Sequence, residues 1–280
     1  MSRLIAGTSS WSEKAWVGPF YPEGTKPGDF LALYAERYPA VEADVTYYRV
    51  PDARLVDGWR RKTPESFRLC AKFPRSIVHA GEGPRPDGAR VLVSDQARGD
   101  TERFLGAMER LGDRCGPLVL QFPYFNRSAF NSPEPFLERL DGYLAALPEG
   151  FRYAVEVRNK NWIGTPLLDL LRRHRVPLVL VDLAYMPHAD SLAKDHDLLT
   201  GDFVYTRLIG DRKKTEAAAE RFDSVALDLS DRLERWAVLL ADLLGQVDEV
   251  FAFANNHFAG YGPGTIDELV ERVAKHGPTS

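Results

Sequence analysis

The sequence lacks the features that mark membrane proteins, disulfide-rich proteins and common redox proteins. No apolar run in its 280 residues approaches the roughly 18 residues that a transmembrane helix needs. Only two cysteines occur, Cys70 and Cys115, and their spacing matches neither a metal-binding nor a redox motif. Residues 1–5 enter an apolar run directly, without a signal-peptide pattern. We therefore expect a cytoplasmic protein that has no membrane partner.

The sequence also has few histidines and no excess of positive charge, and both facts limit the cofactors and partners that we expect. The six histidines form no HxH or HExxH pattern, so a zinc cluster is not expected. A metal site built from carboxylates is possible without histidine. Mg²⁺ or Mn²⁺ bound by Glu42, Glu156 and Asp182 is therefore the alternative to a metal-free site. The formal net charge of −4 favours neither nucleic acid nor anionic lipid as a partner. The sequence itself identifies no cofactor.

What the sequence does contain is a regular alternation of short apolar runs with amphipathic helical patterns. The expected strands are residues 4–6, 40–44, 67–73, 117–122, 153–157, 177–181, 203–208 and 249–254. The main expected helices are residues 30–38, 52–63, 95–111, 132–147, 165–174, 231–244 and 265–275, the first capped by Asp29. Such alternation predicts a parallel sheet with helices on its faces.

The number of these units in a chain of this length favours a closed sheet. We predict an α/β fold that is a single (β/α)8 TIM-like barrel domain over residues 1–280, with long loops at its C-terminal mouth. An open doubly wound sheet is the second choice, but its GxGxxG fingerprint is absent after the first strand.

Polar side chains recur at the C-terminal ends of the expected strands. They are Glu42, Asp44, Lys72, Gln121, Glu156, Arg158, Asp182, Arg207, Asn255 and Asn256. Charges are unfavourable in buried parallel strands unless they are paired or face water or a ligand. Because these groups lie at one end of almost every strand, we expect them to surround the barrel mouth, where active sites of this fold lie.

Strand alternation refines this expectation. Glu42 and Asp44 share one face of their strand, as do Glu156 and Arg158, and the face toward the barrel interior is favoured because helices cover the outside. The nearby aromatic residues suggest the walls of a ligand pocket; they are Trp11, Tyr47, Tyr48, Trp162 and Tyr205.

A purely structural role is the alternative for these charges. The mouth would then be a salt-bridged lid on the core, with Glu156 paired to Arg207 and Glu42 paired to Lys72.

Several of these motifs together resemble a known family. They include GTSSW at 7–11, GPFYP at 18–22, TYYR at 46–49, LQFP at 120–123, EVR at 156–158 and YTR at 205–207. The pattern is similar to the family called "domain of unknown function 72", or YecE-like. This resemblance implies a TIM-barrel-like fold and carries no settled activity. Three positions depart from the family pattern: Asp44 stands where asparagine is frequent, and Asn159 and Ile209 stand where histidine is frequent.

The leading functional hypothesis is an enzyme, a hydrolase or an isomerase, that acts on an anionic substrate bearing phosphate or carboxylate. Glu42, Glu156 and Asp182 would be catalytic, with carboxylate acid–base chemistry. Lys72, Arg158 and Arg207 would form an electrostatic clamp, since arginine matches such anions bidentately. We expect Glu156→Gln and Arg207→Ala to abolish turnover with little change in melting temperature.

Two other functions stay open at this point. One is a non-catalytic module that binds nucleic acid or a small anion, extended by basic loops at 85–90 and 212–214. The other is a two-carboxylate glycoside hydrolase, in which Glu42 and Glu156 would flank the scissile bond.

Overall fold

The computed structural model describes residues 2–81 and 83–277, so residues 1, 82 and 278–280 of the predicted domain lie outside the described part. All paired strands run parallel, as predicted. The strands are β1 (Arg3–Thr8), β2 (Ala40–Ala43), β3 (Arg68–Lys72), β4 (Cys115–Gln121), β5 (Tyr153–Glu156), β6 (Val179–Leu183), β7 (Val204–Gly210) and β8 (Glu249–Ala254). They form two four-stranded sheets, with strand orders β1-β8-β7-β6 and β2-β3-β4-β5.

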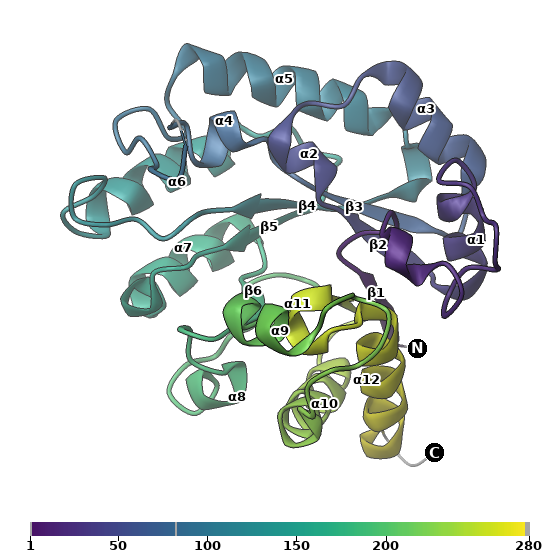
Figure 1. The fold of residues 1–280 in the computed structure, drawn as a ribbon. Coiled ribbons are helices and arrows are strands. Elements are labelled where there is room, and N and C mark those ends of the chain that lie inside the picture. Colours follow the sequence, from purple (N-terminus) through teal and green to yellow (C-terminus); the bar gives the residue numbers. More distant parts are fainter. Residues whose placement is uncertain (1, 82, 278–280) are drawn as a thin grey trace.

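Long helices lie around the outside of the strands (Figure 1). They are α1 (Phe30–Arg37), α3 (Ala53–Lys62), α5 (Asp95–Glu109), α6 (Glu134–Ala146), α7 (Thr165–His174), α10 (Ser230–Leu244) and α12 (Gly262–His276). Shorter helices are α2 (Val45–Tyr48), α4 (Arg75–Val78), α8 (Ala189–Leu192), α9 (Arg212–Ala218) and α11 (Asn256–Ala259). Short 3₁₀ turns are η1 (Lys14–Trp16), η2 (Gly112–Arg114) and η3 (Lys160–Trp162). No helix in the described ranges is long and apolar enough to span a membrane.

Capping side chains mark the starts of two of the long helices, α3 and α5. Oδ1 of Asp52 accepts a hydrogen bond from the Leu55 amide at 2.8 Å, and Oγ of Ser94 accepts one from the Ala97 amide at 3.0 Å. Each side chain satisfies an amide that lacks a partner in the first helical turn. The predicted cap at Asp29 is wrong, because its side chain makes no capping hydrogen bond and its backbone is already helical.

The boundary between β1 and β2 is bridged by a side chain. The hydroxyl of Tyr34 accepts a hydrogen bond from the Thr8 amide at 2.7 Å and donates one to the Ala40 carbonyl at 3.1 Å. The strands are close here, since a Cβ atom at Gly7 would lie 2.0 Å from the Ala40 carbonyl oxygen. Only glycine permits this approach.

The boundary between β5 and β6 has little backbone pairing. Val155 and Leu178 form an isolated parallel bridge, and the Val155 amide donates to the Pro177 carbonyl at 2.9 Å. Pro177 has no amide hydrogen and cannot extend the ladder. The hydrogen-bond ladders therefore do not form the single closed sheet that was predicted. The structure establishes an α/β fold with two parallel sheets.

All eight strands nevertheless contribute to one buried apolar cluster. Its members are Ile5, Ala40, Cys70, Val119, Ala154, Val179, Phe203, Tyr205, Phe251 and Phe253. Cys70 is fully buried in this cluster, as expected for a cysteine that serves as a small apolar side chain. A larger apolar cluster lies between the strands and the helices.

Candidate functional site

Arg207 on β7 is the centre of a buried polar cluster, and its side chain is only 2% exposed. Its Nε and Nη2 atoms donate to Oε1 of Glu42 at 3.0 and 2.8 Å. Its Nη1 atom donates to Oε1 of Gln121 at 2.7 Å and to Oε2 of Glu156 at 2.5 Å. One guanidinium from one sheet therefore binds three strands of the other.

Further predicted residues extend this cluster. Nζ of Lys72 lies 3.3 Å from Oε1 of Glu42 and also pairs with Asp44. The Tyr205 hydroxyl donates to Oε2 of Glu42 at 2.9 Å, and Nε of Arg158 donates to Oε1 of Glu156 at 2.7 Å. We use the name ion-pair network for the set Glu42, Asp44, Lys72, Gln121, Glu156, Arg158, Tyr205 and Arg207.

Two local features hold the network in place. Oγ1 of Thr46 accepts a hydrogen bond from the Lys72 amide at 2.9 Å and lies 2.8 Å from the Lys72 carbonyl oxygen, which ties α2 to the end of β3. Strand register pairs Gln121 with Glu156 and so places both side chains on one face. The sequence carries no signal for the contact of Thr46, because it depends on how the helical turn folds back.

The network keeps its two buried glutamates ionised. Burial opposes ionisation of Glu42, but the charges of Arg207 and Lys72 outweigh it and lower its pKa to about 2. Burial likewise opposes ionisation of Glu156, yet Arg207, Arg158 and Lys72 lower the pKa of that carboxyl. Neither glutamate therefore has the raised pKa of a general acid that works near neutral pH.

Asp44 differs from both glutamates because it lies at the solvent-facing end of the network. Its side chain is 36% exposed, whereas that of Glu42 is fully buried. Burial raises the pKa of Asp44, Lys72 opposes this rise, and the negative charge of Glu42 adds to it. The carboxyl at the open end thus holds a proton more readily than an ordinary aspartate does.

Arg158 is the other partly exposed group of the network, with a side chain that is 23% exposed. Burial raises the pKa values of Tyr47 and Tyr185, and the positive charge of Arg158 opposes the rise in both, which places the two phenols near this guanidinium. Three carboxylates and three cations make up the charges of the network, so its formal charge is zero. The predicted ion pairs Glu156–Arg207 and Glu42–Lys72 are both present.

Asp182 is not part of this network, which corrects its grouping with the two glutamates. Strand β6 begins and ends two residues later than predicted, and its register pairs Asp182 with Leu208, the neighbour of Arg207. Asp182 therefore faces the other side of the strand. Its Oδ2 atom accepts hydrogen bonds from Arg232 at 2.7 Å and from Trp236 at 2.6 Å, both on α10.

This position also affects the metal hypothesis. The three carboxylates considered for Mg²⁺ or Mn²⁺ do not come together, because Asp182 points to α10 while Glu42 and Glu156 bind Arg207. Within residues 2–81 and 83–277, no group of three or more His, Cys, Asp or Glu side chains has an arrangement suited to a metal ion.

The remaining predicted residues make their described contacts elsewhere. Trp11 packs edge-on against Trp59 with ring centroids 5.8 Å apart, and Trp162 stacks on Phe125 at 5.9 Å. Tyr48 is 78% exposed at the end of α2.

Asn255 and Asn256 also have structural contacts. The Oδ1 atom of Asn255 accepts from the His257 amide at 3.0 Å, which caps α11, and Oδ1 of Asn256 accepts from the Gly262 amide at 2.9 Å. Both follow β8, and their hydrogen bonds support the backbone at the starts of α11 and α12.

One side of the strand ends is apolar. Val181, Leu183 and Met186 form a small buried cluster, and Ile163 and Ile209 pack against it. Ile209 occupies the position where the family pattern often has histidine, so that departure adds a branched apolar side chain to this cluster. Ser9, at the end of β1, has a buried hydroxyl for which no hydrogen-bond partner is found within the described ranges.

The basic segments proposed as nucleic-acid loops are only partly as predicted. Residues 85–90 lie outside regular helices and strands. Arg212 begins helix α9 instead of lying in a loop, and its Nε atom pairs with Glu216 at 2.7 Å in an exposed position.

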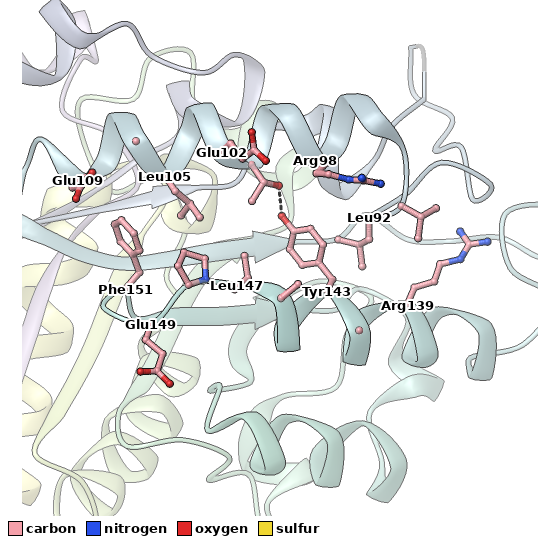
Figure 2. Close-up of a pocket in the computed structure, with 16 residues that line it drawn as sticks. Leu92, Arg98, Glu102, Leu105, Glu109, Arg139, Tyr143, Leu147, Glu149 and Phe151 are labelled. Carbon is pink, nitrogen blue, oxygen red and sulfur yellow. Dashed lines mark hydrogen bonds between the residues drawn. The ribbon is translucent and has the colours of Figure 1, made fainter.

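Two cavities of the structure lie away from the ion-pair network. One of about 860 Å³ lies between α5 and α6, and Figure 2 shows its lining. Another, of about 460 Å³, is lined by Trp11, Trp59 and residues of α1 and α3.

These observations define the class of the protein. It is an α/β protein with two parallel sheets and a charged network that joins them near the strand ends. The model of the family described as "Protein of unknown function DUF72" matches residues 5–279. The chain therefore belongs to this family, as its motifs suggested.

Relatives and solved structures agree with this assignment. The UPF0759 protein YecE of Escherichia coli K12 is 33% identical over 231 residues, which cover 76% of each chain. The crystal structure of a DUF72 family protein from Thermotoga maritima is 26% identical, with a TM-score of 0.71 over 97% of this chain and 99% of that one. A D-psicose 3-epimerase, solved in the presence of D-fructose, is similar in fold alone, at 11% identity and a TM-score of 0.53 over 97% and 96% of the chains.

Proposed function

We propose that the two sheets are halves of one barrel and that the ion-pair network is the active site of an enzyme for a small anionic substrate. The shared apolar cluster of all eight strands and the contacts of Arg207 across the sheets support the barrel. The similarity in fold to an epimerase is consistent with it. The network then lies at the C-terminal end of the barrel, the face that carries active sites in this fold.

The observation that carries this proposal is the contrast between the interior and the open end of the network. Arg207, Glu42 and Glu156 are saturated by one another and hardly exposed. Asp44 and Arg158 are the members that solvent reaches in part. We assign Asp44 as the proton-transferring group, since its pKa is raised.

Arg158 has the complementary role in this proposal. Its Nε atom is held by Glu156, which orients the guanidinium, and its two Nη atoms make no hydrogen bond to a carboxylate among the residues described here. An oriented guanidinium suits a phosphate or carboxylate group, because its donors match those oxygens bidentately. Glu42, Glu156, Lys72 and Arg207 are then positioning residues that hold Asp44 and Arg158 in place.

The other sequence-based hypotheses have less support from the geometry. A two-carboxylate glycosidase needs one carboxylic acid with a raised pKa, and Glu42 and Glu156 are both shifted the other way. A clamp that includes Arg207 is also disfavoured, because its donors are already bound to protein groups.

Binding tests the assignment most directly. We would compare sugar phosphates with the matching neutral sugars by isothermal titration calorimetry, in the wild type and in Arg158→Gln. The phosphorylated ligands should bind more tightly, and the variant should lose about 10–100-fold in affinity, as expected for one charge-assisted contact. Arg127→Gln is the matched control, because Arg127 is exposed and lies in the segment between β4 and α6.

Two results would contradict the proposal. One is equal affinity for phosphorylated and neutral sugars in the wild type. The other is an Arg158→Gln variant that binds the phosphorylated ligand as tightly as the Arg127→Gln control does.

A further inference from the structure

The groove between α5 and α6 is a concave site that shares no residue with the ion-pair network. Its volume of about 860 Å³ falls within the range of about 300–1,000 Å³ that is typical of small-molecule pockets. The two helices are joined across it by a hydrogen bond of 2.5 Å between the hydroxyls of Thr101 and Tyr143, which Figure 2 shows in the middle of the groove.

The walls of the groove are mainly apolar. Their apolar side chains include Leu92, Leu105, Tyr143, Leu147 and Phe151. Leu92 and Leu105 are each 6% exposed, and the others are half-buried. Such walls suit the hydrocarbon part of a ligand, which gains free energy when it leaves water.

Two glycines keep the groove open. Gly106 on α5 and Gly142 on α6 line it, and a Cβ atom at either position would meet nothing within 4 Å. Glycine weakens a helix relative to alanine, and packing does not demand it at these two sites. The groove is therefore open beside both helices because these positions lack side chains, and larger side chains there would fill it.

The charges of the groove are separated along its length. Arg98 and Arg139 lie near one end in Figure 2, Glu109 and Glu149 lie near the other, beside Phe151, and Glu102 lies between them on α5. The only described carboxylate partner of Arg98 is Asp95 at 3.5 Å, and the Arg98 side chain is 73% exposed. One end therefore attracts an anion, while the other end repels a second one.

We propose that this groove binds a small amphiphile with a single anionic head. The head lies between Arg98 and Arg139, and the apolar part extends along the groove toward Phe151. The head is recognised by its charge, so a carboxylate, a sulfate and a phosphate monoester share the required chemistry. Glu109 and Glu149 disfavour molecules that carry an anion at both ends.

Decanoate is a suitable probe, measured on the full chain by isothermal titration calorimetry below its micelle concentration. Decyltrimethylammonium reverses the head charge, and acetate lacks the apolar part. Decanoate should bind with a stoichiometry of one, and each of the other two should bind at least about tenfold more weakly, a difference of about 1.4 kcal/mol. Equal binding of decanoate and decyltrimethylammonium, or no binding of decanoate, would overturn the proposal.

Two variant pairs locate the probe. Gly106→Leu fills the groove and should abolish decanoate binding, whereas Gly99→Leu changes the same helix at a position that does not line it. Leucine favours a helix more than glycine does, so loss of folding would not explain the difference. Arg98→Gln should lower the affinity about tenfold relative to the exposed control Arg127→Gln, as expected for the loss of one charge contact.

The groove is distinct from the proposed active site, and the decanoate experiment tests the groove separately. Asp44→Asn should bind decanoate as the wild type does. Undiminished binding in Gly106→Leu, or loss of binding in Asp44→Asn, would show that the probe lies elsewhere and would refute the groove assignment without bearing on Arg158 and phosphate.

Discussion

Arg207 donates two hydrogen bonds to the same oxygen of Glu42, from Nε at 3.0 Å and from Nη2 at 2.8 Å, and this contact joins β7 of one sheet to β2 of the other. Both side chains are buried, so neither charge is stabilised by water. A charge in this position is tolerated only because its partners neutralise it. The network that holds the proposed site is thus also a link between the two sheets.

Removal of the central guanidinium should therefore destabilise the protein. Arg207→Met leaves Glu42 and Glu156 buried without their main partner, which should lower the free energy of unfolding by about 3–5 kcal/mol. This expectation replaces the one from sequence alone, that loss of Arg207 would leave the melting temperature nearly unchanged. Urea unfolding monitored by tryptophan fluorescence measures the change.

The control for Arg207 is an arginine in an exposed ion pair. Arg110 binds Asp57 at 2.6 Å on the surface, and Arg110→Met should leave the urea midpoint close to that of the wild type. Similar midpoints for the two variants would show that the buried network contributes no more than a surface pair.

Stability should also fall in acid because of the two glutamates. The pKa of Glu42 is lowered to about 2 in the folded protein, and that of Glu156 is lowered as well. An unfolded glutamate titrates near 4.3, so between these values the unfolded state binds more protons than the folded state does. Their stabilising contribution is complete above about pH 5 and is lost as the pH falls through the folded pKa toward about 2.

Urea midpoints measured from pH 7 down to pH 3 test this dependence. Glu42→Gln removes one of the shifted groups, so its stability should vary less with pH than that of the wild type. A variant with the same slope as the wild type would mean that Glu42 has an ordinary pKa in the folded protein.

The proton-transfer role of Asp44 makes a different prediction, about activity. With a substrate found by screening, kcat of Asp44→Asn should fall by about 10²–10⁴-fold, the typical contribution of a general acid or base. The acid limb of kcat/KM should lie above the ordinary aspartate value of about 3.9, because the pKa of Asp44 is raised. Asp95→Asn is the control, since Asp95 is fully exposed on α5.

A wild-type profile with its acid limb at the ordinary aspartate value would speak against this role. So would an Asp44→Asn variant that retains the activity of Asp95→Asn.

The sequence predicted more about the network than about its surroundings, and the reasons are physical. Strand alternation placed Glu156 and Arg158 on one face, and their side chains do meet at 2.7 Å. Asp182 was grouped with the glutamates only because it follows an expected strand; in β6 it pairs with Leu208, whereas Val181 pairs with Arg207, so it faces the opposite side. Side-chain direction depends on register, and composition does not fix register to the residue.

The division into two sheets could not be predicted at all. The apolar pattern of β1 and β2 resembles that of the other strands, and nothing in it reveals that a tyrosine from α1 takes the place of backbone pairing between them. The contact depends on the distance between two strands, which only the folded chain determines.

The last prediction concerns this tyrosine. Tyr34→Phe removes the hydroxyl that binds the Thr8 amide and the Ala40 carbonyl, and it leaves both groups buried without that partner. The free energy of unfolding should fall by about 1–3 kcal/mol. Exchange of the Thr8 amide hydrogen should accelerate, whereas amides inside the β1–β8 ladder should keep their protection, because that pairing runs from Arg3 to Thr8 without Tyr34. Tyr124→Phe is the control, because Tyr124 is 58% exposed. If the Thr8 amide exchanged at the same rate in both variants, the hydroxyl of Tyr34 would not be what holds β1 to β2.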